Sequence, residues 1–285
     1  MAAVKNYFSL VKFSHTIFAL PFAVIGFFLG VKQNGMPPDW TLFLKVVLCM
    51  VFARTAAMAF NRYADRRVDA KNERTRSREI PAGVISTNAA LMLIITSALL
   101  FIITTYYINS ICFYLSPVAL AVVLGYSLTK RFTALCHFIL GLGLSLAPIG
   151  AYLAVTGAFG ILPIFFSACV LLWVSGFDII YALQDEEFDK QNKLFSIPAA
   201  LGKKNALRVS NLAHIFSAAF ILAAGIFGSF GLWYWAGTVI FIALLFYQHS
   251  LVKPDDLRKV NLAFFTTNGI ASVVFAIFVL VELFS

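Results

Sequence analysis

The sequence alternates long apolar runs with shorter polar segments. A helix that crosses a bilayer needs about 20 mostly apolar residues, and nine runs in the chain reach that length. Three of the junctions between runs are so short that we expect tight helical hairpins there, at residues 109–110, 156–160 and 229–231. The predicted spans lie near residues 14–31, 41–60, 89–108, 111–128, 135–157, 161–183, 209–229, 232–250 and 261–284.

The other junctions are longer and polar, and they cover residues 61–88, 129–134, 184–208 and 251–260. Each follows an even-numbered span, so all four lie on the same side of the membrane as the N-terminus. That side holds 19 of the 22 Lys and Arg residues. Because cytoplasmic loops collect Lys and Arg, we expect the N-terminus and these four segments to be cytoplasmic, and any site they form to open toward the cytoplasm.

Composition narrows the class of protein further. Apolar residues make up 61% of the 285 residues, charged residues only 12%, and the mean hydropathy is +0.87. Soluble domains are nearer 45–50% apolar and about 25% charged, so a soluble domain and a disordered chain are excluded. We predict an all-α, polytopic transmembrane helical bundle that forms a single domain over residues 1–285. With minimal loops and no transit peptide, we expect a bacterial inner membrane protein.

The net charge of +9 changes this picture little. In a soluble domain such a charge would suggest nucleic acid as a partner. Here the Lys and Arg residues concentrate on one face of a membrane protein, which the positive-inside rule explains. We therefore expect membrane lipid around the protein and no nucleic-acid partner.

Two polar segments begin with regularly spaced acidic residues. The first contains Asn61, Asp65 and Asp69, and the second contains Asp185 and Asp189. Residues four apart share a helix face, so each set would project together. Stacked carboxylates repel one another unless a cation lies between them, and oxygen ligands without Cys or His favour Mg²⁺.

Basic residues surround both acidic motifs. Mg²⁺ commonly bridges a few carboxylates to the phosphates of a substrate, and Arg and Lys bind phosphate directly. The alternative is that these are ordinary solvated loop charges. Two such motifs, each at the end of an even-numbered span, argue against that alternative. The basic residues are Arg66, Arg67, Arg74, Arg76, Arg78, Lys130, Arg131, Lys190 and Lys193.

Two charged residues lie inside predicted spans. Asp178 precedes Asp185 by seven residues, and Arg54 precedes Asn61 by seven, so each shares a helix face with a motif. Charges within a membrane usually face a cavity or a partner. We expect both to line a polar pocket that continues inward from the metal site. The alternative is a structural Arg54–Asp178 pair between packed helices.

These motifs resemble those of the UbiA superfamily of intramembrane prenyltransferases. Residues 54–69 are similar to the first motif of that family, residues 74–83 to its continuation, and residues 177–185 to its second motif. Tyr126 and Lys130 match its Tyr-x-x-x-Lys element. Within the superfamily the 4-hydroxybenzoate polyprenyltransferase branch is the most similar. The chain has Asn61-Arg62 where many members of that branch carry Asn-Asp.

The resemblance implies transfer of a polyprenyl group from its diphosphate to an aromatic ring, for respiratory quinone biosynthesis. It implies 4-hydroxybenzoate as the acceptor, with a dihydroxynaphthoate for menaquinone as the alternative. Asp65, Asp69, Asp185 and Asp189 would be catalytic, because with Asn61 they would bind the Mg²⁺ that neutralises the polyprenyl diphosphate.

The resemblance also implies roles for the flanking side chains. Lys130, Arg66 and Arg67, joined by Arg78 and Lys193, would bind the diphosphate.

The remaining roles concern the organic part of the reaction. Tyr126 and Tyr181 would stabilise the allylic cation with their ring faces. Arg54, Lys12 or His15 would bind the carboxylate of the aromatic acid. Asp178 would line the same substrate pocket.

Two other classes of function remain open from the residues alone. A secondary transporter of an anionic solute would also have many spans and internal charges. Transporter sites lie near the bilayer midplane, however, and use broken helices, whereas these acidic clusters lie at one membrane face. A non-catalytic scaffold would leave the carboxylate clusters unexplained.

Overall fold

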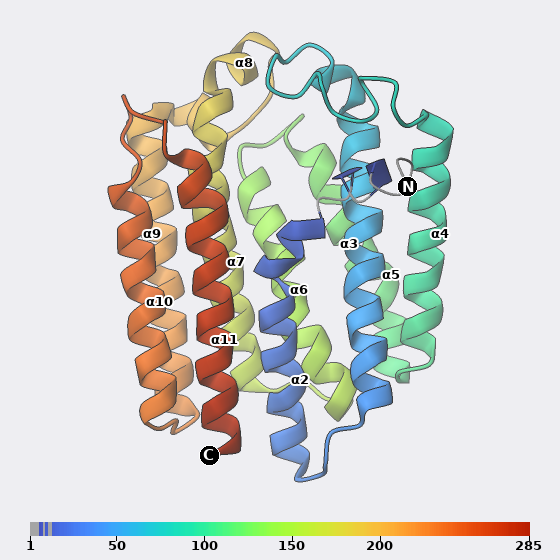
Figure 1. Ribbon diagram of the computed structural model, residues 1–285, viewed down its shortest axis with the longest axis vertical. Helices are drawn as coiled ribbons and strands as arrows, with labels where there is room; N and C mark the ends of the chain where they lie inside the picture. The colour runs from blue at the N-terminus through green and yellow to red at the C-terminus, as the bar shows by residue number, and fades with distance from the viewer. Residues whose placement is uncertain (1–5, 8, 11–12) are drawn as a thin grey trace.

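The computed structural model describes residues 6, 7, 9, 10 and 13–285, which form a bundle of helices roughly parallel to one long axis (Figure 1). Within these residues nine helical segments are long and apolar enough to cross a membrane, as predicted. The helices are α2 (Leu20–Asn34), α3 (Trp40–Asp69), α4 (Thr87–Tyr106), α5 (Ser110–Thr129), α6 (Cys136–Thr156), α7 (Ile161–Ala182), α8 (Glu186–Gln191), α9 (Ile197–Phe227), α10 (Leu232–Ser250) and α11 (Asn268–Phe284).

Three short turns complete the fold. A 3₁₀ turn, η1 (Phe13–Phe18), precedes α2, and a second, η2 (Leu183–Asp185), joins α7 to α8. A π-helical turn, η3 (Leu262–Thr267), leads into α11. Both η2 and η3 contribute residues to the candidate site described below.

Two helices extend beyond the limits predicted from hydropathy. The second span was predicted to end near residue 60, but α3 continues to Asp69. The seventh was predicted to begin near residue 209, but α9 begins at Ile197 and is interrupted at Gly202, whose φ is 75°. Such a φ favours glycine, which has no Cβ. The polar segments 61–88 and 184–208 are therefore partly helical, because polar residues can continue a helix into water.

The core lies between α2, α6, α7, α10 and α11. Trp173 of α7 is fully buried and its ring lies near those of Phe22 and Phe241. Small residues bring the helices together, as is typical in membranes. A Cβ at Gly26 of α2 would lie 2.0 Å from the Pro148 carbonyl oxygen of α6. This core holds the helices that carry the candidate site in fixed positions.

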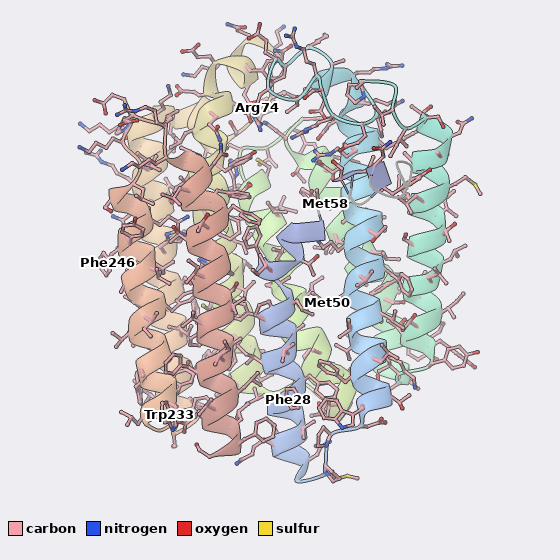
Figure 2. The ribbon with its side chains drawn as sticks, in the orientation of Figure 1. Phe28, Met50, Met58, Arg74, Trp233 and Phe246 are labelled. Carbon is pink, nitrogen blue, oxygen red and sulfur yellow. The ribbon has the colours of Figure 1, made fainter. Side chains whose placement is uncertain are left out.

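The outer surface of the bundle is apolar. Leu99, Ile103 and Val239 are exposed, as is Phe246, which points outward from α10 (Figure 2). Lipid tails, but not water, can solvate such a surface, which fits the predicted membrane location. Arg74 and Trp233 lie at opposite ends of the bundle in Figure 2. The exposed Trp233 suits a membrane interface.

The four polar connections all lie at one end of the bundle, and the C-terminus lies at the other (Figure 1). The segment 70–86 after α3 and the short helix α8 after α7 extend over that end. The four polar segments therefore lie on the same side of the bundle, as the count of spans predicts. This arrangement brings two segments separated by more than 100 residues to the same place.

Candidate active site

The first acidic motif occupies the last turns of α3. Asn61, Asp65 and Asp69 lie on one face of this continuous helix, and the Asn61 side-chain amide donates a hydrogen bond to Asp65 at 3.2 Å. Asp69 is buried. Because the spacing of four matches the helical repeat, the sequence prediction that these three side chains project together holds.

The second acidic motif is less regular than predicted. Asp185 ends the 3₁₀ turn η2, and Asp189 lies in the separate short helix α8. Both carboxylates are buried, and that of Asp189 is fully so. The Ser196 hydroxyl donates a hydrogen bond to Asp189 at 2.8 Å. Asp185 belongs to the described lining of the cavity between the motifs, whereas Asp189 does not.

Each of the four motif aspartates pairs with one basic side chain from outside its own motif. Two partners come from the segment 70–86 and two from the turn after α5. The N–O distances are 3.2 Å for Asp65–Arg131, 2.7 Å for Asp69–Arg78 and 2.8 Å for Asp189–Lys130, and 3.0 Å from Arg74 Nε to Asp185.

These pairs keep the basic groups charged. Burial disfavours the charge on Lys130, but the adjacent Asp189 carboxylate outweighs burial and raises the pKa of Lys130. Burial opposes the charge on Arg74 in the same way, yet its hydrogen bonds to Asp185 raise the pKa of Arg74. Asn72 also donates a hydrogen bond to Asp185, at 3.2 Å. The segment after the first motif is therefore attached to the second motif.

A cavity of about 680 Å³ lies between the two motifs. Its walls come from α3, α5, α6, α7 and the segment 70–86. Most of the residues predicted for the site lie in this lining. They are Asn61, Asp65, Asp69, Arg78, Tyr126, Lys130, Asp178, Tyr181 and Asp185.

Five predicted site residues are absent from the part of the lining that the structure describes. Arg66 stacks on the Tyr63 ring at 4.3 Å, Arg67 and Lys193 are exposed, and Asp189 lies behind Lys130. Arg54 is half-buried in α3.

The two remaining candidates for the acceptor carboxylate were Lys12 and His15. Lys12 and the side chain of His15 lie outside the described residues. Their roles therefore stay predictions.

The inner end of the cavity holds a His–Asp pair. Asp178 lies 2.6 Å from His137 Nδ1, and the Ile197 backbone N–H donates to His137 Nε2 at 3.4 Å. Because Nε2 accepts, Nδ1 carries the proton that is donated to Asp178. The hydrogen-bond partner of Asp178 in the described structure is thus His137, and no Arg54–Asp178 ion pair is present among the described residues.

An aromatic wall closes another side of the cavity. The Tyr181 ring lies 4.2 Å from the Phe264 ring, centroid to centroid, at an angle of 30°. On the Tyr181 ring lies the Arg74 guanidinium, which also donates to the Tyr181 hydroxyl at 3.0 Å. Phe264 comes from the π turn η3, and Asn268 holds that turn by donating to the Phe264 carbonyl oxygen at 2.8 Å.

The sequence analysis missed four residues of this site. Arg62 and Asn72 lie within the first polar segment, but spacing alone does not separate them from the other polar residues there. His137 could have been suspected as the polar residue at the start of an apolar run. Phe264 carries no signal among 30 phenylalanines, because its place depends on the π turn.

The donor atoms suit a hard divalent cation, although the described residues do not form a metal site in advance. Among the described residues no three His, Cys, Asp or Glu side chains converge closely enough to hold a metal ion. The carboxylates instead point to Arg and Lys across the same cavity. An oxygen-only set with compensating cations fits Mg²⁺ together with an anionic substrate.

Comparison with known proteins identifies the fold and its family. A model of the UbiA prenyltransferase family matches residues 19–270. The chain belongs to the UbiA prenyltransferase family. As a UbiA-family protein it is a prenyltransferase with multiple membrane-spanning helices, which confirms the resemblance drawn from its motifs.

Curated relatives carry a common name. The 4-hydroxybenzoate octaprenyltransferase of Nitrosospira multiformis is 31% identical over 248 residues, which cover 87% of this chain and 85% of that protein. The enzyme of the same name from Nitrosomonas europaea is 29% identical over 256 residues, with 90% and 87% covered. These UbiA-family relatives therefore match this chain over most of their length.

Solved structures of the family have the same fold. A UbiA homologue from Aeropyrum pernix, in its apo form, superposes with a TM-score of 0.81 at 28% identity and covers 95% of this chain and 97% of that one. A homologue from Archaeoglobus fulgidus, bound to GPP and Mg²⁺, gives a TM-score of 0.78 at 21% identity, with 98% and 100% covered.

Proposed function

We propose that this UbiA-family enzyme transfers a polyprenyl group from a polyprenyl diphosphate to a small aromatic acid, for respiratory quinone biosynthesis. The proposed acceptor is 4-hydroxybenzoate, and a dihydroxynaphthoate is the alternative. The observation that carries the proposal is the cavity of about 680 Å³ between two aspartate motifs, each aspartate with a basic partner. The names of the curated relatives support the choice of acceptor.

The proposed metal is Mg²⁺, held by oxygens of both motifs. The residues that would hold it are Asn61, Asp65, Asp69, Asp185 and Asp189, of which Asp189 would have to turn from its pair with Lys130. When bound, Mg²⁺ neutralises the diphosphate and assists its departure. The structure of the Archaeoglobus fulgidus homologue with GPP and Mg²⁺ supports this choice.

The basic partners of the aspartates would bind the diphosphate. A carboxylate engaged by a metal no longer needs its Arg or Lys, so Arg78 and Lys130 can turn to the phosphate oxygens in the same cavity. Negative charge on the diphosphate grows as the carbon–oxygen bond breaks. These groups therefore stabilise the transition state more than the ground state.

The aromatic wall would protect the other product of that bond cleavage, the allylic cation. The ring faces of Tyr181 and Phe264 attract a cation through their quadrupoles. Tyr126 of α5 also belongs to the lining of this cavity. Apolar surroundings also exclude the water that would otherwise capture the cation.

The pair of Asp178 and His137 would complete the reaction. Attack through a ring carbon of the acceptor forms a carbon–carbon bond and leaves that carbon with a surplus proton. Asp178 faces the cavity as an acceptor, and His137 holds it in place by donating from Nδ1. Asp178 can therefore take a proton from the acceptor.

A second, apolar cavity would accommodate the prenyl chain. It has a volume of about 360 Å³ and lies among α3, α4, α5 and α6. On α3, Met58 lines the first cavity and Met50 the second, two turns deeper in the bundle (Figure 2). The proposed chain thus extends from the diphosphate site toward the far end of the bundle.

One assay in purified membranes tests the proposed function. We expect diphosphate release from a polyprenyl diphosphate to require both Mg²⁺ and an aromatic acid, with a prenylated acid as product. Comparing 4-hydroxybenzoate with a dihydroxynaphthoate selects the acceptor. Release of diphosphate with neither acceptor, or uptake of an anion without any turnover, would contradict the proposal.

The proposed orientation places the site at the cytoplasmic face. Lys193 is exposed beside the site, so Lys193→Cys offers a label. A membrane-impermeant maleimide should label it in inverted vesicles and not in intact spheroplasts. Labelling in intact spheroplasts would reverse the orientation.

A further inference from the structure

The cavity wall contains one arginine that differs from the others. Arg74, Arg78 and Arg131 each lie within ion-pair distance of an aspartate. Arg62 also lines the cavity, but among the residues that the structure describes no carboxylate comes within ion-pair distance of it. Its Nε is buried and has no hydrogen-bond partner in that part of the chain.

Arg62 is buried, so its lack of an ion-pair partner among the described residues has an energetic cost. Only 4% of the surface of Arg62 is exposed. A buried charge is costly unless an opposite charge and hydrogen bonds compensate for it. The carboxylates of Asp69 and Glu79 attract Arg62 from beyond ion-pair distance, and Glu79 accepts a hydrogen bond from the Ser9 hydroxyl at 2.5 Å. A guanidinium placed in this way is ready for an anion that comes from outside the protein.

The position of Arg62 separates it from the diphosphate site. It lies three residues before Asp65 on α3, or about 4.5 Å deeper along the helix axis. Side chains on a helix lean toward its N-terminus, which for α3 is the end away from the aspartate motifs. Tyr126 and Ser127 of α5, which packs against α3, line the same cavity. Arg62 therefore faces the cavity on the inner side of Asp65 and Asp69, at about the level of Asn61.

We propose that Arg62 is the specificity-determining residue that binds the carboxylate of the aromatic acceptor. This proposal rests on the proposed function, because the reaction brings two anions into one cavity. The four cations paired with aspartates serve the diphosphate, and Arg62 serves the carboxylate. A guanidinium binds a carboxylate through two parallel hydrogen bonds. Arg54, the residue first expected in this role, lies outside the described lining.

The test compares an acid acceptor with its uncharged amide. Arg62→Met keeps much of the side-chain length but removes the charge, and Arg62→Lys keeps the charge but loses the paired geometry. For wild type we expect 4-hydroxybenzoate to be preferred over 4-hydroxybenzamide. In Arg62→Met the KM for the acid should rise about tenfold or more, the KM for the amide should change little, and the acid preference should disappear. The KM of Arg62→Lys for the acid should lie between those of wild type and Arg62→Met.

Three controls make the outcome specific. The KM for the polyprenyl diphosphate should stay within about twofold of wild type, since the proposed contact is with the acceptor alone. Arg208→Met, an exposed residue of α9, should leave all values unchanged. Thermal stability in detergent shows whether each variant is folded, and Arg62→Lys provides the test if Arg62→Met is not.

Failure of the proposal for Arg62 can be distinguished from failure of the proposed function. If folded Arg62 variants keep the full acid preference, or raise the KM for the diphosphate donor instead, the proposal for Arg62 is overturned. The proposal for Arg62 would also be overturned if Arg54→Lys lost the preference for the acid while Arg62→Met kept it. Absence of Mg²⁺-dependent diphosphate release in wild type would instead refute the proposed function itself.

Discussion

Arg74 contacts Asp185 through two guanidinium nitrogens, and so joins the segment after the first motif to the second motif. The same guanidinium donates to the Tyr181 hydroxyl and lies on the Tyr181 ring. One side chain thus connects the proposed metal-binding end of the cavity with its aromatic wall. We therefore expect binding of a metal or a phosphate at Asp185 to act on the wall through Arg74.

The two aspartate motifs should act as one site. Asp65→Asn and Asp185→Asn should each lower turnover by about 100-fold or more, because each removes a ligand charge from the same centre. The double variant should be little worse than either single one. Measuring kcat for the three variants checks this. Asp256→Asn, in the exposed segment after α10, should behave as wild type.

Additive losses in the double variant would mean that the motifs act independently. Full activity in either single variant would remove that residue from the site.

Lys130 should bind the diphosphate rather than the acceptor. Lys130→Ala should raise the KM for the polyprenyl diphosphate and leave that for the acceptor nearly unchanged. The variant should also lose about 1–3 kcal/mol of stability, because it leaves the buried Asp189 without its cation. Titrating each substrate separately, beside a thermal melt, measures both effects. Equal increases in the two KM values would contradict this assignment.

The difference in stability between wild type and Lys130→Ala should not change in mildly alkaline solution. Asp189 raises the pKa of Lys130 above its ordinary value of 10.5. A raised pKa means that the contribution of the pair is complete below pH 10.5 and is lost only as pH rises through the higher value. The difference in Tm between wild type and Lys130→Ala should therefore be the same at pH 7 and pH 9. A difference that shrinks by pH 9 would place the pKa of Lys130 lower.

Phe264 should control the fate of the allylic cation. Phe264→Leu keeps an apolar side chain but loses the ring face, so more of the cation should be captured by water. The measured quantity is the ratio of prenyl alcohol to prenylated acid, which should rise several-fold. Phe264→Tyr restores a ring and serves as the matched control. An unchanged ratio in Phe264→Leu would show that Phe264 only fills space.

The apolar cavity should limit the length of the prenyl donor. Gly150 lines that cavity, and a Cβ added to it would meet nothing within 4 Å. Gly150→Leu should therefore fold normally and shorten the accessible space. We expect turnover of an octaprenyl donor to fall about tenfold while that of a geranyl donor is retained, because only the long chain reaches this depth. Equal effects on both donors would place the chain elsewhere.

Much of this fold follows from periodicity in the sequence. The nine spans follow from apolar runs of membrane length, and the shared face of Asn61, Asp65 and Asp69 follows from a spacing of four on a helix. Counting spans also brings the second motif to the same end of the bundle. These features depend on local geometry and on the bilayer, which act on every residue of a run in the same way.

The rest depends on contacts between distant segments. Which basic residue meets which aspartate is decided by the courses of the segment 70–86 and of the turn after α5, and the sequence contains more basic residues than aspartates around the two motifs. The pairing of Asp178 with His137 depends on how α6 lies beside α7. The break between Asp185 and Asp189 and the π turn under Phe264 are changes in helical hydrogen bonding, and no pattern of apolar residues reports them.

The pairing of each aspartate with a basic side chain also bears on how the protein is made. Four carboxylates that faced one another without counter-ions would repel, and the segment 70–86 would separate from the second motif. Here the counter-ions belong to the chain itself, so insertion into the membrane and attachment of the segment 70–86 can finish before any metal arrives. With the proposed Mg²⁺ dependence, we expect the supply of divalent cation to govern turnover and biogenesis to proceed independently of that supply.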